Sequence, residues 1–449
     1  MTFSTLEDVL AVVRQSLEQD DISAAVAALE ALRPPDKADL FSELKDQHQS
    51  ALLPVLAPDS SADILEEMDD ENAARIVATL PTADIIRIMD QMEPDEAADV
   101  LGEMEPSYAK TVLAGLEDPD EIRPLLLHPE DSAGGLMTSE YLVLRRKMTA
   151  SEALAAVRTW RPDVEDVFDV YVVDQFGHLC GEVSVRQLLM SDPVTPVSDL
   201  MDPEVISVNV GTDQEEVARL MARYDAVTMP VVDSSGTLLG VITVDDVIDV
   251  LEEETTEDFQ RLGASQPLER PYLDTSVLTV VRKRIGWLLL LFLTETLTGS
   301  VLRHFEAELS AVVALSFFIP LLIGTGGNAG SQTTSTIIRA IAVEDLDKRG
   351  FLRPLFHEFS IGFILGIVMA VVAYGRALMW GTTQGVALTV SVSIFAIVVW
   401  ANSMGSVLPL IANRLKIDPT VVSGPAMSTL VDATGLFIYF TIAGILLAL

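Results

Sequence analysis

A single carboxylate lies in the last apolar stretch of the chain. Asp432 stands about midway through residues 420–447, within Thr429-Leu-Val-Asp-Ala-Thr-Gly435, and this stretch contains no Lys or Arg. An ionised side chain in hydrocarbon costs at least about 2.5–3.5 kcal/mol, so an ionisable residue at this depth is by default functional. We therefore interpret Asp432 as part of a cation path. The alternative is a protonated Asp that hydrogen-bonds a neighbouring helix.

Glycines and small polar residues gather in a second apolar stretch, as Gly324-Thr-Gly-Gly-Asn-Ala-Gly-Ser-Gln332. The spacing matches a relaxed dinucleotide fingerprint, but no βαβ unit surrounds it. We expect the helix to break here at membrane depth, where freed carbonyls can coordinate cations. Close packing of helices through small residues is the alternative, and the two are compatible.

Five apolar stretches must position these residues: approximately 285–303, 309–339, 355–379, 386–412 and 420–447. Each supplies, or nearly supplies, the roughly 20 residues that a membrane-spanning helix needs. One set of ends is rich in Lys and Arg, which predicts that these ends and the N-terminal half are cytoplasmic. The basic residues there are Arg282, Lys283, Arg284, Arg339, Lys348, Arg349, Arg353, Arg414 and Lys416, whereas the opposite ends hold Arg303 and Arg376.

The two halves of the chain differ sharply in charge. Residues 1–280 carry 58 Asp and Glu against 18 Lys and Arg, while residues 281–449 carry 9 against 11. A strongly acidic surface concentrates cations and repels itself, and it argues against nucleic acid as a partner. Together with the apolar half, this balance predicts a cytosolic cation sensor that controls a path through the membrane.

Composition excludes several other classes. Cys180 is the only cysteine, so no disulfide forms within the chain, and five scattered His residues do not make a zinc site. The polar, acidic first residues lack the pattern of a signal peptide. A regulated membrane enzyme, with the glycine-rich stretch as a nucleotide site, is a rival interpretation, but Walker A, H-E-x-x-H and G-x-S-x-G motifs are absent from the sequence. We therefore do not expect an enzyme.

An internal repeat occupies the middle of the acidic half. Tyr171-Val-Val-Asp174 before Gly177 and Gly181 resembles Pro230-Val-Val-Asp233 before Gly236 and Gly240. Each copy predicts a helix (151–158; 213–224), two short strands around a glycine turn and another helix (185–189; 244–251). This β-α-β-β-α pattern resembles a tandem pair of CBS domains, in which a Ser or Thr and an Asp three residues later commonly hold a ribose. Thr243 and Asp246 match that pair in the second copy, whereas the first has Ser184 and Gln187.

Residues 1–130 predict short stacked helices, with Pro58, Pro81, Pro94 and Pro106 marking helix starts. The spacing suggests a superhelical repeat. Its expected core comprises Ile64, Leu65, Ile85, Ile88, Val100 and Leu101. Residues 252–284 form a linker that begins with an acidic run and ends in an amphipathic stretch from Leu273 to Arg284.

These features together resemble the MgtE magnesium channels over essentially the whole chain. The resemblance rests on Asp131-Ser-Ala-Gly-Gly-Leu-Met-Thr138, on Pro320 through Gln332, and on Asp418-Pro419 through Gly435, in the same domain order. It implies a multidomain protein of the inner membrane: an all-α superhelical N domain (1–130), an α/β tandem CBS pair (131–251), a linker with a connecting "plug" helix (252–284) and a transmembrane domain of five helices (285–449). It also implies a homodimer in the lipid bilayer, with the pore between the two membrane parts.

The resemblance assigns roles to individual residues. Asp432 would hold hydrated Mg²⁺ in the pore, which Gly424, Ser428 and Asn328 would help to line, and Asp418 would bind ions at the cytosolic mouth. Mg²⁺-sensing acids would be Asp95, Asp99, Asp213, Glu215, Asp225, Asp246, Asp249, Glu254 and Glu257. A nucleotide such as ATP would meet Tyr171, Arg186, Thr243 and Asp246, although Ala226 and Gln187 depart from the family's nucleotide-binding pattern.

The sequence therefore predicts a Mg²⁺-selective channel or transporter for magnesium uptake, in which cytosolic Mg²⁺ is both substrate and regulatory ligand. Mg²⁺ prefers oxygen ligands and loses its waters reluctantly, which suits a carboxylate that contacts the hydrated ion. Two alternatives stay open: transport of another divalent cation such as Co²⁺ or Mn²⁺, and a Mg²⁺ sensor that does not conduct.

Overall fold

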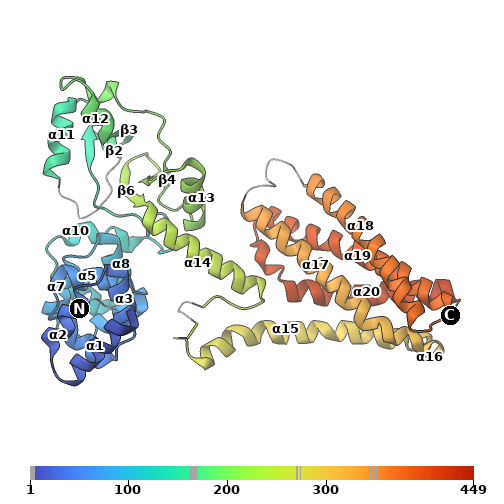
Figure 1. The fold of residues 1–449 in the computed structure, drawn as a ribbon. Coiled ribbons are helices and arrows are strands. Elements are labelled where there is room, and N and C mark those ends of the chain that lie inside the picture. The colour runs from blue at the N-terminus through green and yellow to red at the C-terminus, as the bar shows by residue number, and fades with distance from the viewer. Residues whose placement is uncertain are drawn as a thin grey trace. The chain divides into compact units, whose positions relative to one another are not determined.

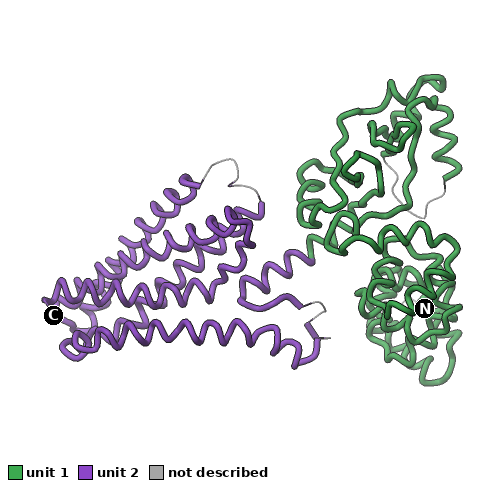
Figure 2. The backbone as a smooth tube through the Cα atoms, turned by 180° about the vertical axis from the view of Figure 1, so that it is seen from behind, with its two compact units in different colours: residues 1–252 green, residues 253–449 purple. Residues whose placement is uncertain are grey.

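A computed structural model describes residues 6–160, 169–268, 272–273, 275–343, 346 and 351–448. Lys348 and Arg349, which contribute to the predicted orientation, lie outside the described residues. The chain forms two compact units, residues 1–252 and 253–449 (Figure 2).

Short helices build the first part of unit 1 (Figure 1). Of the four helices predicted to start at a proline, three begin at the proline itself, and the helix after Pro81 begins at Thr82. Proline favours a helix start because it fixes φ and lacks the N–H that a first turn leaves unpaired. The predicted starts are confirmed. The helices are α1 (Leu6–Glu18), α2 (Ile22–Leu29), α3 (Pro34–Ser42), α4 (Asp46–Leu52), α5 (Pro58–Glu66), α6 (Asp70–Val77), α7 (Thr82–Met89), α8 (Pro94–Glu103), α9 (Pro106–Leu113), α10 (Pro119–Ile122) and the 3₁₀ turn η1 (Leu125–Leu127).

Alternate helices of this region stack on one another. Helix α5 packs on α3 and α7, and α7 on α9, while α6 packs on α4 and α8. Two interleaved rows of helices are the arrangement of a superhelical repeat. All six predicted core residues are at most 2% exposed, so the predicted superhelix is confirmed.

Two small three-stranded sheets follow, one in each copy of the internal repeat. In each, the first strand pairs in parallel with the second, and the second pairs antiparallel with the third. Gly177 and Gly236 take φ values of 90° and 84° in the connecting turns, a conformation that favours glycine. The strands are β1 (Val143–Arg145), β2 (Asp169–Val173), β3 (Leu179–Ser184), β4 (Val208–Asn209), β5 (Thr228–Val232) and β6 (Leu238–Thr243).

The helices of the repeat also match the predicted pattern, with one difference. They are α11 (Ala150–Thr159), α12 (Val185–Met190), the 3₁₀ turn η2 (Val197–Asp199), α13 (Gln214–Tyr224) and α14 (Val244–Leu262). The prediction that the last helix ends at Leu251 is wrong, because α14 continues through the acidic run to Leu262. Glu residues are good helix formers, so the acidic run favours helical continuation.

Within its described residues, unit 2 contains five helices that are long and apolar enough to cross a membrane, which confirms the five predicted spans. The first membrane-spanning helix, α15, begins at Val277 rather than near residue 285. The basic residues Arg282–Arg284 therefore lie on the same helix as the first span. The elements are α15 (Val277–His304), α16 (Glu306–Ala311), η3 (Val313–Phe318), α17 (Ile319–Ala342), α18 (Leu352–Met379), α19 (Gln384–Arg414), η4 (Pro419–Val421) and α20 (Gly424–Leu447).

The predicted break in the second span is wrong. Helix α17 runs without interruption through Gly324–Gln332, after the 3₁₀ turn η3. A Cβ on Gly326 would lie 2.5 Å from Ile397 Cγ2 and 2.7 Å from Val431 Cγ1, and Gly405 packs just as tightly against the Gly330 carbonyl. The glycines therefore bring α17 close to α19 and α20, which is the alternative of small-residue packing.

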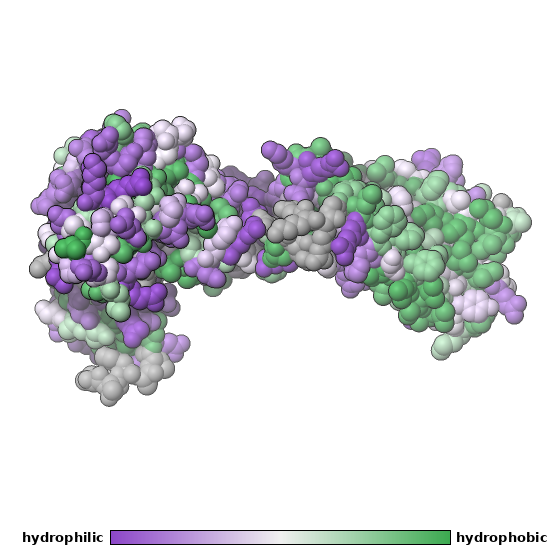
Figure 3. All heavy atoms as spheres, turned by 90° about the horizontal axis from the view of Figure 1, so that it is seen from above, coloured by the Kyte–Doolittle hydropathy of each residue, from purple (hydrophilic) through white to green (hydrophobic). Residues whose placement is uncertain are grey.

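The surfaces of the two units differ in polarity. Hydrophobic side chains cover much of the surface of the unit 2 helices, whereas unit 1 is mainly hydrophilic (Figure 3). Helix α15 exposes Leu288, Leu289 and Phe292. Such faces are stable against lipid or another protein surface rather than water.

Candidate functional site

Helix α8 presents acids on one face and apolar residues on another. Pro94 occupies its first turn together with Asp95 and Glu96, where negative charge is favourable. Ala97, Ala98, Val100 and Leu101 are buried in the core. Asp95 and Asp99 are four residues apart, so they lie on the same side of the helix.

Asp246 of α14 faces the acids of α8 within unit 1. It interacts electrostatically with Asp95, Glu96 and Asp99, and with Glu93, the residue before α8. Its Oδ2 accepts a hydrogen bond from Thr243 Oγ1 at 2.6 Å, which holds the carboxylate in place. The structure thus brings together three predicted sensing residues, Asp95, Asp99 and Asp246.

Burial and mutual repulsion make these carboxylates costly to ionise together. Burial, together with the smaller effect of neighbouring carboxylates, raises the pKa of Glu93 to about 7, of Glu96 to about 10 and of Asp99 to about 8. Burial and Asp246 hold the pKa of Asp95 well above its usual range. Burial also raises the pKa of Asp246 to about 6, against the hydrogen bond from Thr243. A cation would relieve this repulsion.

The Asp95 carboxylate has an unsatisfied atom. Asp95 is 5% exposed, and its Oδ1 finds no hydrogen-bond partner within the described part of the chain. The described side chains nevertheless form no group of three His, Cys, Asp or Glu that could hold a bare metal ion. We call Glu93, Asp95, Glu96, Asp99 and Asp246 the α8–α14 acid cluster; its carboxylate oxygens are of the kind that accept hydrogen bonds from the waters of a hydrated cation.

The remaining predicted sensing acids of unit 1 lie elsewhere. Asp213 caps α13 by accepting a hydrogen bond from the Glu215 backbone N–H at 3.0 Å, and Asp225 ends the same helix with φ 52°. The helix has 11 residues, so its two ends are roughly 16 Å apart. Asp213 and Asp225 of one chain therefore cannot contact the same ion. Asp249, on α14, interacts electrostatically with Glu67.

A second group of charges surrounds Asp418 in unit 2. Arg261 pairs with Glu257 on its own helix and with Asp418 Oδ2, which lies 2.5 Å from Arg261 Nη1. Asp258 is near Asp418, Glu254 and Arg339, and burial followed by the neighbouring acids raises the pKa of Asp258. Asp418 and Glu257 therefore share Arg261 near the end of α14, and Glu254 lies near Asp258 on the same helix.

Asp432 lies in the middle of α20 and is partly buried. It interacts electrostatically with Glu295 of α15, an exposed residue in this single chain. The predicted pore residues Gly424 and Ser428 contact α17: Ser331 Oγ donates to the Gly424 carbonyl at 3.2 Å and lies 3.4 Å from Ser428 Oγ. Asn328 is exposed on α17.

The predicted nucleotide residues are only partly gathered. Tyr171 and Thr243 line a cavity of about 40 Å³, in which the Tyr171 hydroxyl lies 2.7 Å from Thr228 Oγ1. Arg186 is exposed near Asp169, while Asp246 belongs to the α8–α14 acid cluster.

Sequence reasoning missed three members of these clusters. Glu93 and Glu96 flank the Pro94 helix start, and their position next to Asp95 and Asp99 could have indicated one acidic helix end. Arg261 follows Glu257 by four residues, which is the spacing of an ion pair once α14 is known to extend that far.

A helical repeat, a CBS pair and five membrane-spanning helices with a mid-span carboxylate define the class: a multi-pass membrane transport protein with a large regulatory portion. The chain belongs to the MgtE family. Family models match residues 319–442 (MgtE, divalent cation transporter), 32–131 (MgtE intracellular N domain) and 197–253 (CBS domain).

Relatives cover nearly the whole chain. The magnesium transporter MgtE of Thermus thermophilus is 40% identical over 98% of this chain and 99% of its own length. The magnesium transporter MgtE of Bacillus subtilis is 32% identical over 93% and 92%. The crystal structure of the cytosolic domain of the Mg²⁺ channel MgtE in complex with ATP is 39% identical, with a TM-score of 0.51 over 54% of this chain and 99% of that chain.

Proposed function

We propose that this chain conducts Mg²⁺ through the inner membrane and that cytosolic Mg²⁺ regulates the flux. The observation that carries the proposal is Asp432, the only charged residue of α20, beside the tightly packed glycine helix α17. A carboxylate there attracts a divalent ion and contacts its waters without removing them, which suits the slow dehydration of Mg²⁺. The names of the full-length relatives support Mg²⁺ as the ion.

A homodimer is part of the proposal. Helix α17 exposes Gly324, Asn328, Gln332, Ser335, Thr336 and Arg339 in the single chain. Their spacing of three to four residues places them on one face. A polar face is unfavourable against lipid, so we propose that a second copy covers it and that the pore runs between the copies. Two Asp432 carboxylates would then share one hydrated ion.

Regulation follows from the α8–α14 acid cluster. When cytosolic Mg²⁺ is scarce, repulsion between α8 and α14 favours their separation. When Mg²⁺ is abundant, hydrated ions between the carboxylates hold α8 and α14 together. In this arrangement the ion path through the membrane is closed. A shift from mostly open to mostly closed needs about 5.5 kcal/mol of differential binding, which several weak sites could supply jointly. The acids around Asp418 would add a further site at the cytosolic mouth.

The deciding experiment measures Mg²⁺ entry into liposomes that contain the purified full-length protein. The variant Asp432→Asn removes the charge but keeps the size, and Glu295→Gln is the matched control because it neutralises the neighbouring membrane carboxylate. We expect Asp432→Asn to reduce entry by at least about 100-fold, consistent with the loss of roughly 3 kcal/mol of ion stabilisation, while Glu295→Gln still conducts. Equal entry in wild type and Asp432→Asn would remove Asp432 from the pore. Absence of entry in folded wild type would favour a sensor that does not conduct.

A second candidate is transport of another divalent cation, because the matching family model describes divalent cation transporters in general. Competition in the same liposomes separates the two. Co²⁺ or Mn²⁺ entering faster than Mg²⁺ at equal concentration would favour this candidate.

The solved MgtE cytosolic domain is a complex with ATP, but the CBS pair of this chain is poorly suited to bind ATP. The cavity at Tyr171 and Thr243 measures about 40 Å³, far below the roughly 300 Å³ at which ligand pockets begin. The carboxylates of Glu140 and Asp169 also line it and would repel phosphates. Gln187 is held by Ser184 in a hydrogen-bonded pair. ATP is therefore left out of the proposed function, and calorimetric titration of the wild-type protein with ATP should give no binding heat.

A further inference from the structure

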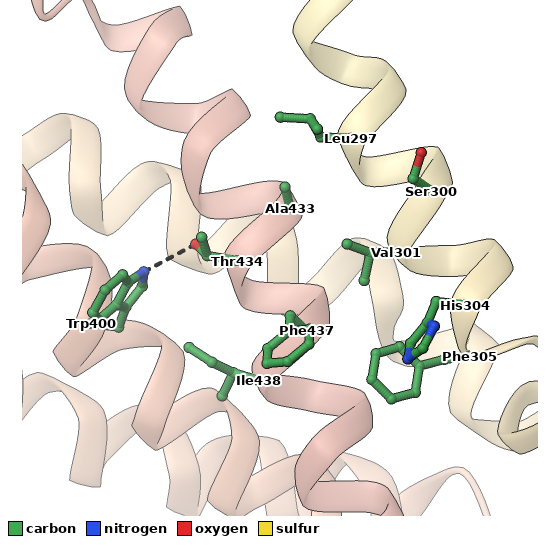
Figure 4. Close-up of a pocket in the computed structure, with 10 residues that line it drawn as sticks. All are labelled: Leu297, Ser300, Val301, His304, Phe305, Trp400, Ala433, Thr434, Phe437 and Ile438. Atoms are coloured by element: carbon green, nitrogen blue, oxygen red, sulfur yellow. Dashed lines mark hydrogen bonds between the residues drawn. The ribbon is translucent and has the colours of Figure 1, made fainter.

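An apolar cavity of about 770 Å³ lies between α15, α19 and α20 (Figure 4). Its volume is in the range of ligand-binding pockets. None of the described lining residues is Asp, Glu, Lys or Arg, so the cavity does not suit a cation. The lining residues are Leu297, Ser300, Val301, His304, Phe305, Trp400, Ala433, Thr434, Phe437 and Ile438.

The cavity lies on the opposite side of both helices from the acidic pair. Each residue of an α-helix turns the side chain by about 100°. On α20, the lining residues from Ala433 to Ile438 centre roughly 170° away from Asp432, and on α15 those from Leu297 to His304 centre roughly 170° away from Glu295. The charged side of the α15–α20 pair and its apolar side are therefore distinct faces.

Because the apolar and charged faces are on opposite sides, the position of the pore determines what surrounds the apolar face. This conclusion rests on the proposed function. If the pore and the second copy lie on the side of Asp432, the cavity opens toward the bilayer. Both helices are of membrane-spanning length, so the medium outside is hydrocarbon. The Trp400 indole donates to Thr434 Oγ1 at 3.0 Å, which satisfies the polar groups at the back of the cavity and leaves an apolar wall (Figure 4).

Side chains of both charges flank the cavity residues His304 and Phe305 in the sequence, at the C-terminal end of α15. Arg303 precedes them, and Glu306 and Glu308 follow in α16. The orientation predicted from Lys and Arg makes this the outer membrane surface. A cation beside two carboxylates complements a headgroup that carries both a phosphate and an ammonium group, because each charge then meets its opposite.

We propose that the cavity between α15, α19 and α20 binds one acyl chain of a zwitterionic phospholipid, phosphatidylethanolamine, whose phosphate lies near Arg303 and His304 and whose ammonium lies near Glu306 and Glu308. The lipid fills the space between α15 and α20 and thereby braces the first span against the pore helix.

The test measures lipids retained by the full-length protein. Protein is reconstituted in nanodiscs with equal amounts of phosphatidylethanolamine, phosphatidylglycerol and phosphatidylcholine, then released for native mass spectrometry. Ala433→Phe fills the cavity, and Val371→Phe is the matched control because it adds a ring on an exposed face of α18. We expect Ala433→Phe to retain about tenfold less phosphatidylethanolamine than wild type and control, since exclusion of two methylene groups already costs about that factor. Equal retention by Ala433→Phe would overturn the proposal.

A second variant tests the headgroup without touching the cavity. Glu306→Gln combined with Glu308→Gln should equalise retention of phosphatidylethanolamine and phosphatidylglycerol, and an unchanged preference would overturn the assigned headgroup contact. Leu297→Cys in a Cys180→Ser background reports on a second copy, because a disulfide between chains would place a partner in the cavity instead of lipid. Lipid retention does not require flux, so a protein that retains phosphatidylethanolamine but conducts no Mg²⁺ would overturn only the proposed function.

Discussion

The Arg261 guanidinium lies 2.5 Å from the Asp418 carboxylate, measured from Nη1 to Oδ2. The other Asp418 oxygen accepts hydrogen bonds from the Thr420 backbone N–H at 2.8 Å and from Thr420 Oγ1 at 2.6 Å. Arg261 also pairs with Glu257. The Arg261 side chain thus pairs with two carboxylates that were predicted to bind Mg²⁺, so an ion that bound either carboxylate would have to compete with Arg261.

Removal of Arg261 should sensitise the protein to cytosolic Mg²⁺. In Arg261→Gln, Glu257 and Asp418 keep their charge without a partner, and Mg²⁺ binds them more tightly. We expect the Mg²⁺ concentration that halves the flux to fall about fivefold, at the low end of coupling energies between sites. The effect on stability should be small, about 1 kcal/mol or less, because the pair is partly exposed.

Flux assays at several internal Mg²⁺ concentrations check this prediction. Arg282→Gln is the control, because it removes the same charge from an exposed position on α15. A half-inhibiting concentration that stays unchanged or rises in Arg261→Gln would show that Arg261 does not compete with the ion.

The α8–α14 acid cluster should make unit 1 less stable as pH rises in the absence of divalent cations. The pKa values of Glu93, Asp99 and Asp246 are about 7, 8 and 6 in the folded state, against about 4 in an unfolded chain. The folded state binds protons more tightly, so this contribution to the free energy of unfolding is present below about pH 4 and is lost as pH rises toward 8.

Amide hydrogen exchange of α8, corrected for the intrinsic effect of pH on exchange, measures this loss. We expect weaker protection at pH 8 than at pH 5.5 without Mg²⁺, and recovery at pH 8 when Mg²⁺ is added. Glu93→Gln with Asp99→Asn should show a smaller dependence on pH. Protection that increases from pH 5.5 to 8 in metal-free wild type would contradict the raised pKa values.

Neutralising the sensing acids on α14 should abolish shut-off. The variant in which Asp246, Asp249, Glu254 and Glu257 are replaced by their amides loses the charges that hydrated Mg²⁺ would bridge. We expect it to conduct at internal Mg²⁺ concentrations that close the wild type, at least about tenfold above the wild-type half-inhibiting value. Normal shut-off in this variant would remove the sensing role from α14.

The glycines of α17 should act through packing. Gly326→Ala would put a Cβ 2.5 Å from Ile397 and should destabilise the membrane helices by about 1–3 kcal/mol. Gly375→Ala on α18 is the control, because its Cβ would have no neighbour within 4 Å and alanine favours the helix. Thermal unfolding in detergent compares the two. Equal melting temperatures would show that α17 does not rely on the close contact at Gly326.

Local patterns were sufficient to predict most of the architecture. Pro58, Pro94 and Pro106 begin helices because proline suits a first helical turn whatever surrounds it. The five spans follow from the length of apolar runs, and the strands around Gly177 and Gly236 follow from alternation and a glycine turn. Asp432 could likewise be singled out, because a lone charge in an apolar run is visible without a structure.

The tertiary structure determines which of those elements contact one another and through which side chains. The sequence by itself determined that glycines gather at 324–330, but the unbroken α17 and its contact with Ile397 and Val431 depend on two other helices. It determined that acids are abundant, but only packing brings Asp95 to Asp246 and Arg261 to Asp418, more than 150 residues apart in each case. Helix and strand formation depend on neighbours along the chain, whereas charge pairing and close approach depend on which distant surfaces meet.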